Sequence, residues 1–424
     1  MVTLRVVDPD PEPGRAPVIR FGTAASARGL HTIVNTAFVS TYPPQRCGIA
    51  TFTADLAKAV GHSEIVALQP PEKTGFYPSE VGRRIARDVP SDYPSAARWV
   101  DSRPFDAVSI QHEYGIWGGP DGGYVLDFID GLRTPIVTTL HTVLQNPSPS
   151  QRRILLELVH ASAATVVMSS SAAELLSRSY GIDASQVEIV PHGVPYLPLV
   201  DSDTVKPQLG LKGHKVLLSF GLIGPGKGYE AAIAAMPAVV RADPTAIYVI
   251  VGATHPELIR REGESYRKKL VDLASSSGVA NHVRFVGRYV DMTELGMWLT
   301  AADIFVTPYP NLEQIVSGTL AYAMGAGKAI VSTPYAYANE RLAEGRGRLV
   351  AAGSVDALAE ALIELALNSN LRLEHGRKAY AHSRGMLWPE VGATYSKIFA
   401  RVAGLSTKPD LAAVPMAALA VASA

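Results

Sequence analysis

The chain has 424 residues, of which 47% are apolar and 18% charged, a composition typical of a globular protein with two or three domains. Its 39 basic and 39 acidic side chains cancel, which excludes a global field able to gather nucleic acid or an anionic membrane surface. The single cysteine, Cys47, excludes an internal disulfide, and the N-terminal residues carry no charged-then-apolar leader, so we expect a cytoplasmic protein.

Short β-branched runs alternate with longer helical patterns along most of the chain, which predicts α/β domains with parallel sheets. The predicted strands of the first half are Ile33–Val39, Glu64–Leu68, Ala107–Gln111, Ile136–Thr139, Thr165–Met168 and Val187–Val190. Those of the second half are Lys215–Phe220, Ala246–Val251, Val283–Phe285, Ile304–Thr307, Ala329–Ser332 and Gly347–Val350. A proline-rich stretch separates the two halves. We therefore expect Rossmann-like domains over residues 32–195 and 211–384, joined by a linker over 196–210.

The two ends of the chain lack this alternation. We expect a flexible arm over residues 1–31 and a disordered tail over 405–424. Residues 385–404 carry apolar side chains near helical spacing, which predicts a helix that packs back on the N-terminal domain. No apolar run reaches the roughly 20 residues that span a bilayer, so we expect no stable membrane insertion.

A glycine-rich segment, Gly221-Leu-Ile-Gly-Pro-Gly-Lys-Gly228, joins a predicted strand to a helix that begins near Tyr229. Backbone amides in such a turn, the positive end of the helix and Lys227 together form a phosphate site. Gly228 stands where a P-loop carries the Ser or Thr that holds magnesium, which disfavours a nucleoside triphosphatase. The alternative interpretation is a glycine-rich connection with a solvated lysine.

A second candidate anion site lies at the start of a later helix. Ser317, Gly318 and Thr319 are predicted to open this helix, and they offer unpaired amides and hydroxyls. Because parallel sheets place ligands beyond the carboxyl ends of their strands, both candidate sites are expected at the same edge.

The segment Gln111–Gly119 follows the end of a predicted strand in the first domain and is rich in aromatic and polar side chains. His112, Glu113, Tyr114 and Trp117 are expected to bind an acceptor, because aromatic faces and paired polar groups suit sugar rings. The alternative is that His112 and Trp117 are core residues.

Metal chemistry has little support in the sequence. The histidines are scattered, and the D-x-D patterns Asp8–Asp10 and Asp201–Asp203 fall in the expected arm and linker. We expect neither a metal ion nor a cofactor, and the chain has no Gly-x-Ser-x-Gly elbow of a serine hydrolase.

Four stretches carry a resemblance to a known family: Cys47–Phe52, Val190–Val194, Gly221–Gly228 and Ala321–Val331. In this order they resemble the family-four retaining glycosyltransferases of the GT-B fold, over about residues 32 to 403. The resemblance implies two Rossmann-like domains that face each other across a cleft. It also implies transfer of a sugar from a nucleotide-activated donor.

The resemblance assigns roles to individual residues. It implies that Lys227 is the cation on the donor phosphates, with Gly226 beside it in the same loop. It also implies that the amide of Gly48 faces the phosphates and the acceptor from the other domain. His141, in Thr138-Thr-Leu-His-Thr-Val143, matches the histidine that lies beside the donor sugar in this family.

The sequence departs from the family's pattern at three positions. Leu222 stands where an arginine usually follows the first glycine of the phosphate loop. Gln314 and Tyr322 stand at the positions of two glutamates, the first near the transferred sugar and the second on the nucleotide ribose. Glu313 takes the first role if the loop shifts by one residue. The alternative is that Glu313 is a surface acid and Tyr322 a core aromatic residue.

The basic segment after the strand Ala246–Val251 offers a replacement for the missing arginine. Arg260, Arg261 and Arg267 lie there, and Arg261 and Arg267 are the expected donor-binding residues. The alternative is a solvated helix whose Glu and Arg side chains pair with each other at spacings of three and four residues.

The resemblance implies a metal-independent retaining hexosyltransferase that uses a GDP- or UDP-sugar, of mannosyl or glucosyl type, and a small-molecule or glycan acceptor. One alternative is a phosphorylase of the same fold that uses a sugar 1-phosphate. Another is a non-catalytic homologue that binds a sugar or a nucleotide.

Overall fold

The computed structural model describes residues 33–71 and 75–405, so the expected arm over 1–31 lies outside the described residues, as does the expected tail apart from Leu405. The first domain comprises β1 (Thr36–Ser40), α1 (Gly48–Val60), β2 (Ser63–Gln69), β3 (Val81–Ala86), α2 (Asp92–Asp101), β4 (Ala107–His112), α3 (Tyr124–Ile129), β5 (Ile136–Leu140), α4 (Pro149–Ala161), β6 (Ala164–Val167), α5 (Ser170–Leu175) and β7 (Val187–Ile189).

The second domain comprises β8 (Lys215–Phe220), α6 (Tyr229–Ala242), β9 (Ala246–Val251), α7 (Pro256–Glu262), α8 (Ser265–Ser276), β10 (Val283–Val286), α9 (Met292–Ala301), β11 (Ile304–Thr307), α10 (Gly318–Gly325), β12 (Ala329–Ser332), α11 (Ala336–Arg341), β13 (Arg348–Leu349), α12 (Val355–Leu367) and α13 (Ser369–His382). A last helix, α14 (Trp388–Val402), follows it.

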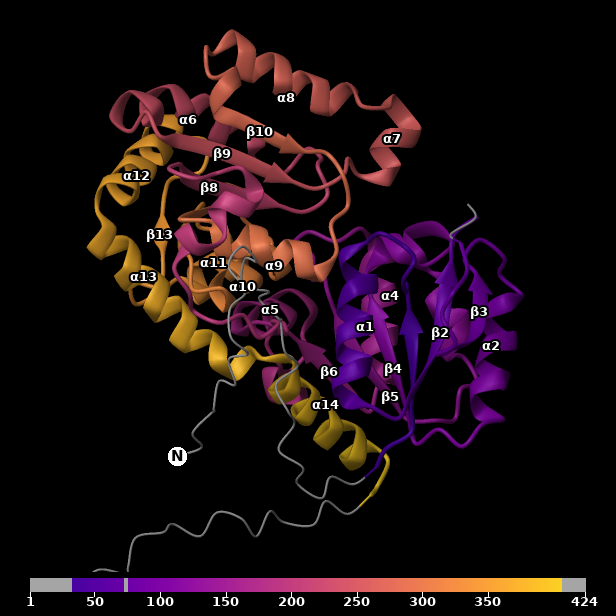
Figure 1. The fold of residues 1–424 in the computed structure, drawn as a ribbon. Helices are drawn as coiled ribbons and strands as arrows, with labels where there is room; N and C mark the ends of the chain where they lie inside the picture. Colours follow the sequence, from indigo (N-terminus) through magenta and orange to yellow (C-terminus); the bar gives the residue numbers. More distant parts are fainter. Residues whose placement is uncertain (1–32, 72–74, 406–424) are drawn as a thin grey trace, which may run out of the picture.

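Each domain is built on one parallel sheet with helices on both faces (Figure 1). The strand order is β3-β2-β1-β4-β5-β6-β7 in the first sheet and β10-β9-β8-β11-β12-β13 in the second. Every residue of β1, β4 and β5 is buried, because these central strands are covered on both faces. The predicted α/β class with two Rossmann-like domains is confirmed.

Strand β3 is absent from the strands predicted from the sequence. It lies at the edge of the first sheet, and Ile85 is its only fully buried side chain. Arg83 and Arg84 interrupt the apolar run that marks the inner strands. An edge strand needs less apolar surface than a central one, so its sequence signal is weak.

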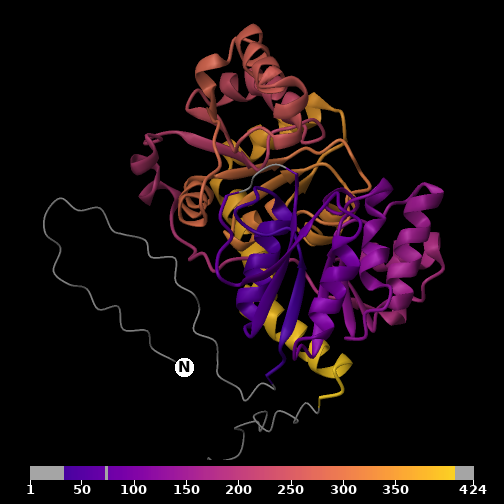
Figure 2. The same ribbon diagram turned by 90° about the vertical axis from the view of Figure 1, so that its right-hand side faces the viewer.

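Helix α14 crosses from the second domain to the first, where it packs against α1 and β5 (Figures 1 and 2). The Phe399 ring meets the Phe38 ring edge-on at 5.9 Å between centroids. The Tyr395 hydroxyl lies 2.9 Å from the Thr139 hydroxyl in the buried interface. The C-terminal helix therefore completes the core of the N-terminal domain.

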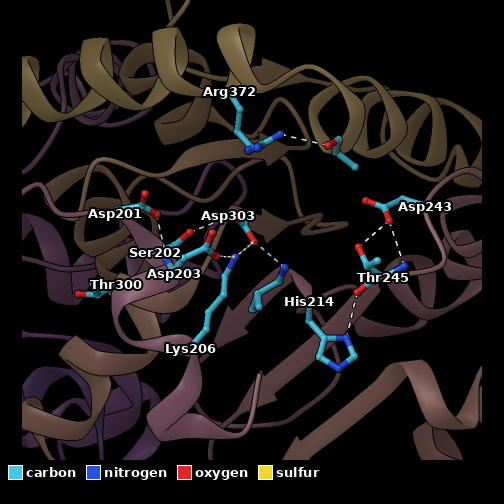
Figure 3. A network of polar contacts seen from close by, with 12 residues as sticks. Asp201, Ser202, Asp203, Lys206, His214, Asp243, Thr245, Thr300, Asp303 and Arg372 are labelled. Carbon is cyan, nitrogen blue, oxygen red and sulfur yellow. Dashed lines mark hydrogen bonds and ion pairs between the residues drawn. The ribbon is translucent and has the colours of Figure 1, made fainter. Parts of the chain in front are cut away.

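The second half of the expected linker is tied to the C-terminal domain (Figure 3). Lys206 is only 3% exposed, and its Nζ lies 2.7 Å from Asp203 and 2.9 Å from Asp303. Asp303 also accepts hydrogen bonds from Ser202 and from the amide of Val216 at the start of β8. This buried ion pair fixes the linker to the amino-terminal edge of the second sheet.

Candidate active site

The carboxyl-terminal ends of the two sheets meet at the junction of the domains. The Ser169 hydroxyl, after β6, donates to the carbonyl of Ile315, in the loop after β11, at 2.9 Å. The hydroxyls of Thr51, on α1, and Tyr289, after β10, also lie 3.4 Å apart across the junction. Parallel α/β sheets bind ligands beyond these strand ends, so the loops at the junction form the candidate site.

Lys227 lies beside the start of α10. Its Nζ is 4.5 Å from the centre of the Tyr309 ring, and the Tyr309 hydroxyl is 2.9 Å from the Thr319 hydroxyl. The attraction between an ammonium group and an aromatic face holds the lysine there. The two anion-binding features predicted from the sequence, the Lys227 loop and the start of α10, are therefore brought together.

Two glycines give the Lys227 loop its shape. Gly228 has a φ of +70°, and a Cβ at this position would lie 2.0 Å from the carbonyl oxygen of Pro308. Gly226 has a φ of +86°, but a Cβ there would meet no atom within 4 Å. The first glycine permits close packing against the loop after β11, and the second leaves open space beside Lys227.

The first turn of α10 presents donors to the same place. The Ser317 hydroxyl accepts a hydrogen bond from the Leu320 amide at 3.3 Å and caps the helix. The amides of Gly318 and Thr319 have no acceptor within the helix, because the first turn of a helix has none to offer. This end of α10 therefore carries unpaired N–H groups and the positive end of the helix dipole.

His192 belongs to the site, although it was not among the residues predicted from the sequence. A Cβ at Gly318 would lie 2.8 Å from His192 Nε2, so the imidazole covers the first residue of α10. His192 Nδ1 lies 2.7 Å from the carbonyl of Gly193, an acceptor, which places the hydrogen on Nδ1 and leaves Nε2 as an acceptor. Its place in the Val190–Val194 motif was the available signal.

His141 follows β5 directly and is 8% exposed. Its Nε2 lies 2.8 Å from Gln111 Oε1, and the Gln111 amide nitrogen donates to Ser109, so His141 Nε2 carries the hydrogen. The Phe52 ring stands between the two histidines, 4.9 Å from His141 and 5.1 Å from His192 between centroids. Phe52 thus joins the His141 side of the junction to the start of α10.

Both imidazoles are neutral at physiological pH. Burial, followed by the neighbouring His192 and His112, lowers the pKa of His141 to about 3. Burial also lowers the pKa of His192 to about 4. Neutral imidazoles can donate and accept hydrogen bonds, so this pair suits the hydroxyl groups of a sugar better than a phosphate.

Helix α1 brings its N-terminus to the junction from the other domain. The Cys47 thiol caps the helix by accepting a hydrogen bond from the Ala50 amide at 3.3 Å. A Cβ at Gly48 would meet no atom within 4 Å, so the space over this helix end is open.

The residues at the positions of the family's two glutamates lie in different settings. Gln314 is partly buried and donates to the Val316 carbonyl at 2.8 Å, whereas Glu313 is exposed. Tyr322 is 6% exposed and donates at 3.1 Å to Asp55, on α1 of the other domain. Burial raises the pKa of the Asp55 carboxyl to about 6, although the Tyr322 hydrogen bond opposes the shift.

The structure places three of the four expected acceptor residues in the core of the first domain. Trp117 is 3% exposed and Tyr114 9%, and both belong to the core of the first domain. His112 is fully buried, with its ring 4.9 Å from that of Tyr114. Glu113 is partly buried, and its carboxylate accepts a hydrogen bond from Thr142, next to His141. Apolar packing beneath the β4 loop accounts for the three buried side chains.

The expected replacements for the missing arginine lie on exposed helices. Arg267, on α8, pairs with Glu264 at 2.9 Å and packs beside Gly287. Arg261 is exposed on α7. The pair of Arg267 with Glu264 matches the solvated-helix interpretation.

Two further observations apply to residues 33–71 and 75–405. Within these ranges, no three His, Cys, Asp or Glu side chains gather as a metal site requires. Nor does any helix in them have the length and apolar character needed to cross a bilayer.

Two Rossmann-like domains that meet at their strand ends are the architecture of GT-B glycosyltransferases. Residues 48–196 match the family model described as Glycosyltransferase Family 4, and residues 214–368 match that of Glycosyl transferases group 1. The chain belongs to the family-4 glycosyltransferases of the GT-B fold.

Two relatives agree with this assignment, and a solved structure shares the fold. The chain is 26% identical over 324 residues to a phosphatidyl-myo-inositol mannosyltransferase of Mycolicibacterium smegmatis, covering 75% of this chain and 77% of the relative. It is also 26% identical to a D-inositol 3-phosphate glycosyltransferase of Corynebacterium glutamicum, covering 64% and 67%. HepE of Anabaena, solved with UDP and glucose, superposes with a TM-score of 0.71 at 15% identity, covering 86% of this chain and 99% of HepE.

Proposed function

We propose that the chain is a retaining, metal-independent hexosyltransferase that moves a mannosyl or glucosyl group from a GDP- or UDP-sugar to an acceptor hydroxyl. The observation that carries this proposal is the convergence of Lys227 with the start of α10 at the domain junction. The solved complexes of HepE with UDP and the mannosyltransferase among the relatives support a nucleotide-sugar donor.

In this proposal the donor diphosphate lies against Lys227, Gly226 and the first amides of α10, with the Gly48 amide opposite. These groups stabilise the negative charge that grows on the leaving diphosphate. Preorganised donors of this kind contribute several kcal/mol to lowering a barrier, on the order of 3 kcal/mol for one hydrogen-bond donor. Lys227 supplies the positive charge that a metal ion supplies in other transferases.

The donor sugar then lies near His141, whose Nδ1 is left as an acceptor for a sugar hydroxyl. The acceptor hydroxyl attacks from the face on which the diphosphate departs, and the diphosphate takes its proton. No carboxylate base is required for this step, which accords with Gln314 at the position of the first glutamate.

The acceptor approaches from the side of Glu113 and Thr142. Burial raises the pKa of the Glu113 carboxyl, although the hydrogen bond from Thr142 opposes the shift. Because the names of both relatives contain inositol, inositol phosphates and phosphatidylinositol are the first acceptors to test.

The donor is tested by calorimetric titration of the full chain, without metal, with GDP, UDP, ADP, mannose 1-phosphate, glucose 1-phosphate and inorganic phosphate. Lys227→Ala is compared with Lys269→Ala, which removes an exposed lysine on α8. We expect GDP or UDP to bind the wild type and Lys269→Ala equally, and Lys227→Ala at least tenfold more weakly.

The other outcomes separate the alternatives. Binding of phosphate or a sugar 1-phosphate, but of no nucleotide, would favour the phosphorylase. Nucleotide binding without release of GDP or UDP from any sugar donor would favour the non-catalytic homologue.

A further inference from the structure

One buried hydrogen bond joins the two helices whose N-termini meet at the site. The Tyr322 hydroxyl, on α10, donates to Asp55 Oδ2, on α1, at 3.1 Å. Asp55 lies about two turns after Gly48, and Tyr322 lies about one turn after Gly318. Each helix is rigid over such a distance, so the bond restrains how far apart the two N-termini lie.

The Tyr322 ring packs against two other rings. Its centroid lies 6.0 Å from that of His192 and 6.2 Å from that of Phe220. Burial, and then the Asp55 carboxylate, raises the pKa of the Tyr322 phenol well above its usual range. The phenol therefore keeps its proton and remains the donor in this bond.

The Asp55 carboxylate lowers folding stability at this position. Burial is the main cause that raises its pKa, and the Tyr322 hydrogen bond and Lys58, on the same helix, oppose it. Tyr42, in the loop before α1, also interacts electrostatically with Asp55, and Tyr289, after β10, interacts with Tyr322. A partly buried carboxylate lowers folding stability unless its interactions compensate for the lost hydration. A gain in stability therefore does not explain why a carboxylate stands at this position.

We propose that Asp55 and Tyr322 are positioning residues for the transfer reaction. Their hydrogen bond holds α1 against α10, so that the Gly48 amide and the first amides of α10 lie at the separation that the donor diphosphate requires. This inference rests on the proposed function and adds to it a pair of residues that do not touch the donor.

The test compares Tyr322→Phe, Asp55→Ala and the double variant, with steady-state kinetics in donor and in acceptor, because alanine cannot accept the hydrogen bond from Tyr322. Tyr322→Phe keeps the ring and its packing, so it removes the hydrogen bond alone. We expect the donor KM to rise about tenfold in each single variant, with no further rise in the double variant. The acceptor KM should stay within about twofold of the wild type.

The control is Tyr380→Phe, on α13. The Tyr380 hydroxyl donates to the Leu197 carbonyl at 3.2 Å, outside the candidate site. This variant also removes one partly buried tyrosine hydrogen bond, so we expect the donor KM to remain within about twofold of the wild type. Thermal unfolding of each variant separates positioning from loss of structure, because Tyr322→Phe should weaken donor binding while it keeps the packing of the ring.

The outcomes distinguish this inference from the function on which it rests. An unchanged donor KM in Tyr322→Phe, or effects of the single variants that multiply in the double variant, would refute the positioning role alone. A wild-type chain that binds no nucleotide would refute the proposed function, and the positioning role with it.

Discussion

Replacing Asp55 by asparagine should stabilise the protein at neutral pH. Burial raises the pKa of this carboxyl from 3.8 to about 6, so the folded chain holds the proton more tightly than the unfolded chain. The contribution of Asp55 to stability is therefore present below about pH 4 and is lost as the pH rises through 6. The difference of about 2.2 pKa units (6 − 3.8) corresponds to roughly 3 kcal/mol.

Asparagine cannot ionise and can still accept the hydrogen bond from Tyr322. We therefore expect Asp55→Asn to raise the free energy of unfolding by up to about 3 kcal/mol at pH 7.5. The advantage should shrink as the pH falls and should vanish below about pH 4. Urea unfolding of both proteins at several pH values between 4 and 7.5, followed by tryptophan fluorescence and by circular dichroism, measures this difference.

The control is Asp272→Asn, which removes an exposed carboxylate on α8. It should leave the free energy of unfolding within about 0.5 kcal/mol of the wild type at every pH. An Asp55→Asn protein less stable than the wild type at pH 7.5 would refute the reasoning. So would a difference between the two proteins that does not change with pH.

Two further substitutions test the packing around the site and the linker. Gly228→Ala should destabilise the C-terminal domain by more than about 2 kcal/mol and weaken nucleotide binding, because its Cβ would lie 2.0 Å from the Pro308 carbonyl in a left-handed conformation. Gly213→Ala, at a similar φ of +80° but in open space, should cost less in the same urea titration. Lys206→Met should cost about 3–5 kcal/mol, because it leaves the Asp303 carboxylate buried without its cation. A cost below about 1 kcal/mol in urea unfolding would show that water reaches Asp303.

The strand–helix alternation of the sequence predicted the fold class, because periodicity and turn chemistry are local properties of the chain. It missed β3, whose arginines at an exposed sheet edge hide the apolar pattern. The Lys227 loop and the start of α10 were also recognisable. Glycines that need a positive φ and a serine that caps a helix act within a few residues of themselves.

The tertiary structure decided which side chains share the site. Tyr114 and Trp117 follow a strand end as binding residues do, but the packing of α3 and α4 over the sheet encloses them in the core. His192 and Asp55 meet α10 where the two domains pack against each other. The hydrogen bond between Asp55 and Tyr322 joins positions far apart in the chain, so no local sequence pattern can predict it. The contact forms only when the two sheets are packed against each other in the folded protein.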